Sequence, residues 1–555
     1  MTTSIPRSRR LGALLAAGAL TAAAAGCAQS EREGGSGSGS GSDEEKTFVF
    51  SGAAEPTTLD PFYASDGETF RIARQQFEGL VGTKPGTADP APLLATSWET
   101  SDDGLSHTLE LRKGVKFSDG TPFNADAVCW NFDRWYNTPE GLTQGEDLTY
   151  YYQSLFKGFA TGPLSESAIY ESCKADGDSS VTINLTEPWS GFIPALSLPA
   201  FSMQSPTALQ KYPEPKNGDP RKGPYATAHP TGTGPFVLDS WERGKQVTLK
   251  ANPDYWGEKP KVDRVVIVAI DDPTARAQAL QNGDIDGYDL VGPGDIESLK
   301  SEGFQIVDRA PFNILYLGMN QKYGALDDIR VRQAIAHAID KEAVASQTMP
   351  EGTVVASQFV PDLVNGYNPD VPTYDYDPGK AKQLLKAAGQ EDMTLQFNYP
   401  TDVSRPYMPA PGDTFKAISS QLEKVGITIK PEADTWSPDY LEKVQGTADH
   451  GIHLLGWTGD YNDTDNFLGV FFGQKSNEWG FDNPELFKDL QKARVIPTPE
   501  EAKPMYEQIN AEVMEFLPGI PLAHPVPSLA FADYVSGYQA SPVQDEVWNT
   551  VDITE

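Results

Sequence analysis

The pattern of apolar and polar residues predicts several short strands in the first half of the chain. Thr108 to Leu111 and Val181 to Leu185 alternate polar and apolar side chains, as half-buried strands do. Phe48 to Phe50 and the longer run from Val262 to Ile270 are rich in aromatic and β-branched residues, which favour strands. We therefore expect a strand at each of these four positions.

The middle of the chain has the periodicity of amphipathic helices instead. One helix should follow Asp327 and Asp328, with an apolar stripe of Val331, Ile335, Ala338 and Ile339. A second should begin at Asp377-Pro378 and end at Gly389. A third, from Asp413 to Val425, should lead into a strand at 427–429. These units predict a compact α/β lobe between about 310 and 520.

The N-terminus has the composition of an export signal followed by a tether. Residues 1–26 contain three arginines and then an apolar run of about 15 residues, which spans about 22 Å as a helix and is too short for a bilayer core of about 30 Å. The ending Ala24-Ala25-Gly26-Cys27 resembles a bacterial lipobox, which makes Cys27 a lipidation site; the alternative is a plain signal peptide. Residues 27–46 are rich in Gly and Ser and predict a flexible tether with a reach of roughly 25 Å. We expect a chain anchored by lipid on the extracytoplasmic face of the cell membrane.

Composition narrows the possible functions. The formal net charge is −34, and such a surface repels phosphate backbones, so nucleic-acid binding is excluded. The chain has three cysteines. If Cys27 carries the lipid, Cys129 and Cys173 are left and can pair with each other. In an oxidising compartment this pair predicts a disulfide, with two buried free thiols as the alternative.

Motifs for catalysis and for cofactors are missing. The chain has no H-E-x-x-H, G-x-x-x-x-G-K-[ST] or G-x-S-x-G segment. His450 and His453 are expected to be structural or exposed. Asp460, Asp463 and Asp465 lack the glycine and the twelfth-position glutamate of a calcium loop. We expect neither an enzyme nor a resident metal or cofactor.

A series of motifs nevertheless resembles one known family. In chain order they are PTTLDPF (56–62), LRKGVKFSDGTPFNAD (111–126), GTGPF (232–236), NPDYWG (252–257), LQNGDID (280–286), DDIRVRQAIAHAID (327–340), YDPGKAKQLLKAAG (376–389) and GWTGDYNDTDNFL (456–468). Together they resemble the dipeptide/oligopeptide class, family 5, of the extracytoplasmic solute-binding proteins of ABC importers. The resemblance covers the chain from Thr47 onward.

The resemblance implies a fold and a role. The fold is a two-lobed, periplasmic-binding-protein-like α/β fold with an extra subdomain on lobe I, the cluster C type. Carried over, lobe I comprises 47–309 and 525–555, and lobe II comprises 310–524. Two chain crossings, near 308–313 and 517–525, would make a hinge, so that rotation of the lobes traps a ligand. The implied partners are a short peptide and the membrane subunits of an ABC permease, and we expect a monomer.

The resemblance also implies a binding site. An aspartate in G-W-x-x-D would bind the ligand's α-ammonium, which makes Asp460 the candidate, with Trp457 and Gly459 in the same segment. An arginine in R-P-Y would bind the α-carboxylate, which makes Arg405 the candidate, followed by Tyr407. The charged ends of an extended dipeptide lie roughly 6–7 Å apart, so two fixed opposite charges can measure peptide length.

Alternatives remain open at each level. Arg405 is alternatively a surface cation. Asp460 is alternatively a cap of the following turn, or Asp463 or Asp465 shares its role. Trp457 and Tyr407 are alternatively core residues. The ligand is alternatively a longer peptide, an oligosaccharide, a metal chelate or haem. Other classes of protein are a secreted hydrolase and a sensor or adhesin that uses the same fold.

Overall fold

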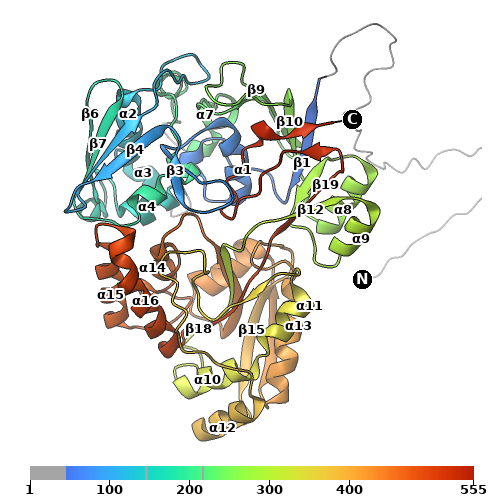
Figure 1. The fold of residues 1–555 in the computed structure, drawn as a ribbon. Coiled ribbons are helices and arrows are strands. Elements are labelled where there is room, and N and C mark those ends of the chain that lie inside the picture. The colour runs from blue at the N-terminus through green and yellow to red at the C-terminus, as the bar shows by residue number, and fades with distance from the viewer. Residues whose placement is uncertain (1–44, 144–147, 216–217, 555) are drawn as a thin grey trace, which may run out of the picture. The chain divides into compact units, whose positions relative to one another are not determined.

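The fold is taken from a computed structural model that describes residues 45–143, 148–215 and 218–554 (Figure 1). Glu45–Glu555 forms one compact unit. The signal peptide expected at 1–26, the lipid site expected at Cys27 and nearly all of the tether expected at 27–46 lie outside the described residues. Within the described ranges, every helix is too short or too polar to cross a bilayer.

A mixed sheet of seven strands joins the beginning and the end of the described chain. The predicted strands at 48–50 and 262–270 are confirmed as two of its neighbouring members, which run parallel. In sheet order its strands are β12 (Gln305–Asp308), β19 (Ser528–Phe531), β11 (Gly287–Asp289), β1 (Thr47–Gly52), β10 (Arg264–Ala269), β9 (Gln246–Ala251) and β8 (Phe236–Glu242). The helices that contact it are α1 (Gly67–Gln76), α7 (Pro224–Ala228), α8 (Pro273–Asn282) and α9 (Ile296–Glu302).

The segment between β1 and β8 forms a separate four-stranded antiparallel sheet. It contains the predicted strands at 108–111 and 181–185, and its order is β4 (Ala95–Thr100), β5 (Ser106–Leu111), β7 (Ser180–Leu185) and β6 (Tyr170–Ala175). Cys129 on α2 (Ala125–Tyr136) is bonded to Cys173 on β6, which confirms the predicted disulfide. The other helices before β8 are α3 (Glu140–Thr143), α4 (Tyr150–Phe156), α5 (Phe192–Ala195) and α6 (Pro206–Lys211).

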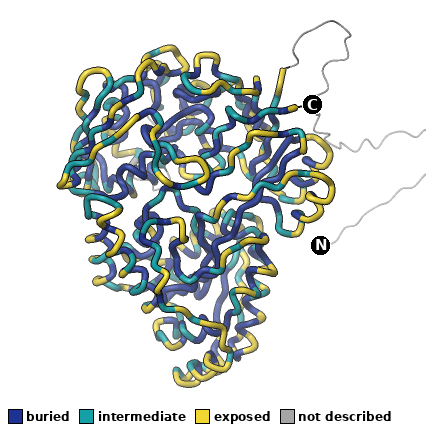
Figure 2. Tube along the Cα trace, viewed as in Figure 1, coloured by how far each residue is buried: buried dark blue, intermediate teal, exposed yellow. Residues whose placement is uncertain are grey.

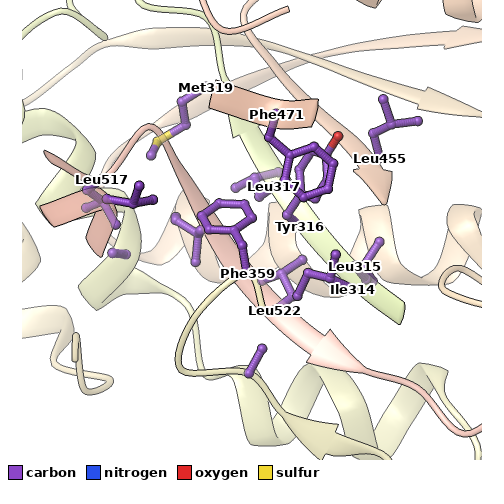
Figure 3. Close-up of a cluster of buried hydrophobic side chains, with 14 of the residues drawn as sticks. Ile314, Leu315, Tyr316, Leu317, Met319, Phe359, Leu455, Phe471, Leu517 and Leu522 are labelled. Atoms are coloured by element: carbon purple, nitrogen blue, oxygen red, sulfur yellow. The ribbon is translucent and has the colours of Figure 1, made fainter. Parts of the chain in front are cut away.

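A six-stranded sheet forms the core of the second half of the chain. In order its strands are β14 (Val354–Val355), β18 (Gly519–His524), β13 (Asn313–Met319), β17 (Ile452–Thr458), β15 (Thr394–Pro400) and β16 (Thr428–Asp434). All seven residues of β13 are buried, whereas the surrounding helices keep exposed faces (Figure 2). Figure 3 shows Tyr316 of β13 against Phe359 and Phe471, with ring centres 5.7 and 5.3 Å apart.

Local sequence sets the ends of the helices around this sheet. Asp328 caps α10 (Ile329–Ala338), and Asp377 caps α12 (Pro378–Ala388), which ends at Gly389 with φ +70°. The predicted start of the third helix at Asp413 is wrong, because α13 (Pro411–Lys424) begins two residues earlier. Proline is favoured at a first helical position, so Pro411 and Gly412 begin the helix. The remaining helices are α11 (Lys341–Thr348), α14 (Leu468–Phe472), α15 (Pro484–Arg494) and α16 (Pro499–Phe516).

Two short connections join the seven-stranded and six-stranded sheets, one from β12 to β13 and one from β18 to β19. They lie side by side, since the Arg309 N–H donates to the Pro527 carbonyl at 2.9 Å and the Asn313 amide donates to the Pro525 carbonyl at 3.1 Å. The Ser528 hydroxyl also donates to Asp308 at 2.6 Å. The lobe boundaries 47–309, 310–524 and 525–555 stay a prediction.

Candidate functional site

Asp460 and Arg405 follow neighbouring strands of the six-stranded sheet. β15 and β17 are parallel partners, with Phe397 opposite Ile452. Arg405 follows the end of β15, and Asp460 follows the end of β17. Because parallel strands end at the same edge of a sheet, both residues lie at one edge. The connection from the seven-stranded sheet enters β13 at this edge, where Asn313 pairs with Thr458.

The Asp460 carboxylate is held from both halves of the molecule. The hydroxyl of Tyr151, on α4, donates to Oδ1 at 2.9 Å. The amide of Asn466 donates to Oδ2 at 3.3 Å, and the Asp460 N–H donates to Asn466 Oδ1 at 2.8 Å. Burial raises the pKa of Asp460 to about 6, against the opposing effect of these two donors. The group is thus an anion at neutral pH that a cationic ligand can stabilise.

Neighbouring aspartates have other roles. Asp463, not Asp460, caps the short 3-10 helix Thr464–Asn466, and its carboxylate accepts from the Asp465 N–H at 2.7 Å. Burial, with the nearby Asp465 charge, raises the pKa of Asp463 to about 7. Asp465 forms an ion pair with Arg494. The cap alternative for Asp460 is therefore wrong.

The histidine pair is structural. His450 and His453 are fully buried, and both are close to Glu478, whose carboxylate is 3.4 Å from His453 Nε2. The Tyr316 hydroxyl donates to the same carboxylate at 2.7 Å. In the described ranges, no group of three or more His, Cys, Asp or Glu is placed to hold a metal ion.

Trp457 and Gly459 support Asp460 from the same segment. Trp457 Nε1 donates to Asn466 Oδ1 at 3.4 Å, so the indole and the Asp460 backbone share one acceptor. A Cβ at Gly459 would lie 2.3 Å from the Phe312 ring and 2.7 Å from the Phe467 ring. Glycine is required here because the backbone approaches these rings closely.

Arg405 lies in different surroundings. Its backbone pairs with Met408 in a tight turn, through bonds of 3.1 and 2.9 Å. Its guanidinium carbon is 4.6 Å from the ring centre of Trp436, which follows β16. Its Nε is buried with no hydrogen-bond partner, and across the described chain no carboxylate lies within 4.0 Å of the group. The guanidinium is therefore available for an anionic ligand.

Tyr407 lies in the core beside this turn. It is 7% exposed, and burial raises its pKa to about 12. A Cβ at Gly456 would lie 2.3 Å from the Tyr407 ring, so the tyrosine packs directly on β17. This position agrees with the core alternative, and contact with a ligand stays a prediction.

The candidate residues thus form two groups, Asp460 with Trp457 and Arg405 with Tyr407. In the part of the chain that the structure describes, no hydrogen bond or ion pair joins Asp460 to Arg405. Sequence reasoning did not find the supporting residues Tyr151, Asn466 and Trp436. Asn466 lies within the motif at 456–468, so its position was a usable signal. Tyr151 and Trp436 lie far from both candidates in sequence, and no pattern marks them.

Contacts between the two halves continue next to Asp460. Tyr461 is 1% exposed and packs in the aromatic core of the four-stranded subdomain. The Arg494 guanidinium, at the end of α15, donates to the Leu155 carbonyl at 2.7 Å and lies 4.8 Å from the Trp189 ring centre. Asp460 therefore lies next to a packed interface between the halves.

A family model matches this chain over residues 89–479; its description is bacterial extracellular solute-binding proteins, family 5. The resemblance inferred from the motifs is confirmed by this match. The match spans more than half of the chain and includes Arg405 and Asp460.

Individual relatives agree with the family model. A dipeptide-binding protein of Escherichia coli (strain K12) is 31% identical over 525 residues, which cover 92% of this chain and 95% of that protein. Heme-binding protein A of Haemophilus influenzae is 31% identical over 544 residues, 95% of this chain and 96% of that protein. The periplasmic binding protein DppA of Helicobacter pylori, solved with the peptide STSA, has a TM-score of 0.76 at 26% identity and covers 92% of this chain and 99% of that one.

These matches decide two predictions. The two-lobed periplasmic-binding-protein-like α/β fold is confirmed, because the solved structure superposes over nearly its whole length. The prediction that the chain is not an enzyme is confirmed too, since the matching family and relatives are binding proteins.

Proposed function

Because the chain belongs to the bacterial extracellular solute-binding proteins of family 5, we propose that it captures dipeptides or other short peptides and delivers them to an ABC permease. The similar protein of Escherichia coli is named for dipeptide binding, and the similar protein of Helicobacter pylori was solved with a peptide. The observation that carries the proposal is the position of Asp460 and Arg405 at one edge of the same sheet.

In this proposal the two side chains bind opposite ends of the ligand. Asp460 accepts hydrogen bonds from the α-ammonium, and the fork of Arg405 donates to both oxygens of the α-carboxylate. Charged ends roughly 6–7 Å apart would match a dipeptide. Trp457, Gly459 and Tyr407 complete the proposed site as its walls and backbone.

Capture is proposed to involve closure of lobe II on lobe I. The adjacent connections at 308–313 and 524–528 would act as the hinge, because rotation about two short adjacent segments needs few changes of backbone angle. The second connection lies later than the crossing expected near 517–525, because residues 519–524 form β18. Contacts such as Tyr151 with Asp460 and Arg494 with Leu155 would then form or break together.

The proposed location is the extracytoplasmic face of the cell membrane. A lipid on Cys27 would anchor the chain, and residues 27–46 would let the binding unit reach a permease. We propose that the protein acts as a monomer.

Titration calorimetry with matched ligands tests this function. Ala-Ala should bind, whereas N-acetyl-Ala-Ala and Ala-Ala-amide each lack one charged end and should bind at least about tenfold more weakly. No heat and no thermal shift with millimolar Ala-Ala or a peptide pool would contradict peptide binding. Titration with haemin, followed by absorbance, tests the ligand class named for the Haemophilus influenzae protein.

A further inference from the structure

Arg74, on α1, lacks the carboxylate partners that several other deeply placed arginines have. The buried Arg276, on α8, likewise donates only to backbone carbonyls, but no interaction links it to Asp460 in the described chain. Its Nη1 donates to the Gln544 carbonyl and its Nη2 to the Val543 carbonyl at 3.3 Å, while its Nε is buried with no partner. Over the described residues, no carboxylate lies within 4.0 Å of it. By contrast, Arg71, Arg134 and Arg309 each contact two carboxylates.

The guanidinium of Arg74 lies in the same aromatic surroundings as the Asp460 carboxylate. Its central carbon is 5.9 Å from the ring centre of Phe70, one turn earlier on α1. The Phe70 ring is 5.6 Å from the ring of Tyr151, whose hydroxyl is 2.9 Å from Asp460 Oδ1. The two charges are close enough that Arg74 lowers the pKa of Asp460.

The acidic residues beside Arg74 are already engaged. Asp545 accepts from the Thr83 hydroxyl, and Glu546 forms an ion pair with Arg309 at 2.5 Å. Burial lowers the pKa of Arg74 while Asp545, Glu546 and Asp460 raise it, so the guanidinium is a partly desolvated cation. A desolvated cation without a direct counter-ion is costly unless an anion joins it.

We propose that Arg74 is a specificity residue that binds a second carboxylate of the ligand, so that the site prefers peptides whose first residue is Asp or Glu. This inference rests on the proposed function, in which Asp460 binds the α-ammonium and Arg405 the α-carboxylate. The side-chain carboxylate of an N-terminal glutamate lies roughly 5 Å from its own ammonium nitrogen. It can therefore reach Arg74 while the ammonium stays on Asp460.

Charge and shape agree with this assignment. In this proposal the guanidinium groups of Arg74 and Arg405 and the Asp460 carboxylate bind the ligand, and their charges complement a dipeptide with one ammonium and two carboxylates. Each Nη of Arg74 carries a second N–H besides the one that it donates to a backbone carbonyl, so a carboxylate can still accept from the guanidinium. The neutral amide of an N-terminal glutamine has the same size but lacks the charge, which makes the Glu/Gln pair a direct test.

The experiment is calorimetric titration of the purified protein with Glu-Ala, Gln-Ala, Ala-Ala and Lys-Ala at pH 7.5. Glu-Ala should bind about tenfold or more tightly than Gln-Ala, and Lys-Ala should bind most weakly. In Arg74→Met the preference for Glu-Ala over Gln-Ala should fall to less than about twofold, with Ala-Ala changed less than about threefold. Arg74→Lys should keep part of the preference, because it keeps the charge but not the fork.

Arg112→Met is the matched control. Arg112 is also half-buried in the first half of the chain, donates to the Leu93 carbonyl at 3.0 Å and lies 4.4 Å from the Trp256 ring centre. This variant should keep the full Glu/Gln preference, and thermal unfolding should show both methionine variants folded.

Three outcomes would overturn the inference. If dipeptides bind without a Glu/Gln preference, Arg74 does not bind a second carboxylate, although the proposed function stands. If Arg74→Met weakens Glu-Ala and Gln-Ala equally, Arg74 acts only through Asp460. If no peptide binds at all, the proposed function and this inference both fail.

Discussion

Asp460 and Arg405 follow neighbouring strands of one sheet, yet their surroundings differ. The Asp460 carboxylate has donors on both sides, Tyr151 from the first half of the chain and Asn466 from the second. Among the described residues, Arg405 is supported only from the second half of the chain, by the Trp436 ring and by its backbone turn with Met408. In the proposed site, the anionic end is therefore held by both halves of the chain, whereas the cationic end is held, among the described residues, by the second half alone.

This difference indicates how each end would respond to a ligand. A buried carboxylate with two neutral donors is only partly compensated, so an ammonium ligand gives it the counter-ion that it lacks. The Arg405 guanidinium is a partly solvated cation stacked on the Trp436 ring, and this contact does not require the two halves to touch. We expect changes at Asp460 to have larger effects than changes at Arg405.

The largest effect is expected for Asp460→Asn. The amide has the same shape but cannot offer a negative charge, so affinity for Ala-Ala should fall about 100-fold or more in calorimetry. Asp463→Asn is the matched control, since Asp463 lies in the same loop but caps the 3-10 helix. Equal losses in both variants would mean that several aspartates share the binding of the ammonium.

Arg405→Ala should have the next largest effect. Loss of the carboxylate's partner should weaken Ala-Ala about 10- to 100-fold and should weaken tetra-alanine much less, because a longer peptide extends beyond Arg405. Both ligands can be titrated against the same preparation. Equal losses for the two peptides would show that Arg405 does not set ligand length.

Affinity should also depend on pH through Asp460. Its pKa is raised to about 6, and only the ionised form attracts an ammonium, so binding is strong above pH 6 and weakens as pH falls. Between pH 7 and pH 5 the affinity for Ala-Ala should drop about tenfold, while the ligand's own groups keep their charges. Calorimetry at pH 5, 6 and 7 measures this, and Asp460→Asn should show a flat profile.

Tyr151→Phe should have the smallest effect and would test the contact between the halves. Removing one hydrogen bond to the carboxylate should weaken Ala-Ala about two- to fivefold at pH 7. Because the Tyr151 bond lowers the pKa of Asp460, its loss should also move the midpoint of the pH profile above that of the unchanged protein. An unchanged midpoint in Tyr151→Phe would exclude Tyr151 from the site.

Much of the fold could be predicted because its signals are local. Asp377, Pro378 and Gly389 delimit α12 by capping chemistry that operates within a few residues. The strands at 48–50 and 181–185 were visible from alternation and β-branching. The start of α13 was placed two residues too late, because Asp413 resembles a cap while Pro411 is equally compatible with the first turn.

The candidate site was predictable only in part. Asp460 and Arg405 were predicted from short motifs, and such motifs contain only residue types and their spacing within one segment. Tyr151 is 309 residues from Asp460 in sequence, and Trp436, which contacts Arg405, lies outside all of the family motifs. No local rule links such pairs.

Residue types and spacing along the chain were enough to predict the family, the strands and helix caps and the pairing of Cys129 with Cys173, and to propose Asp460 and Arg405 as the charged groups of the site. Each of these depends on residue types within one segment or on a count of residues. Three-dimensional contacts were needed to establish that Tyr151 donates to Asp460 and that Asp463 is the cap. The physical reason is that burial and electrostatic interactions act through space, between segments that only the folded chain brings together.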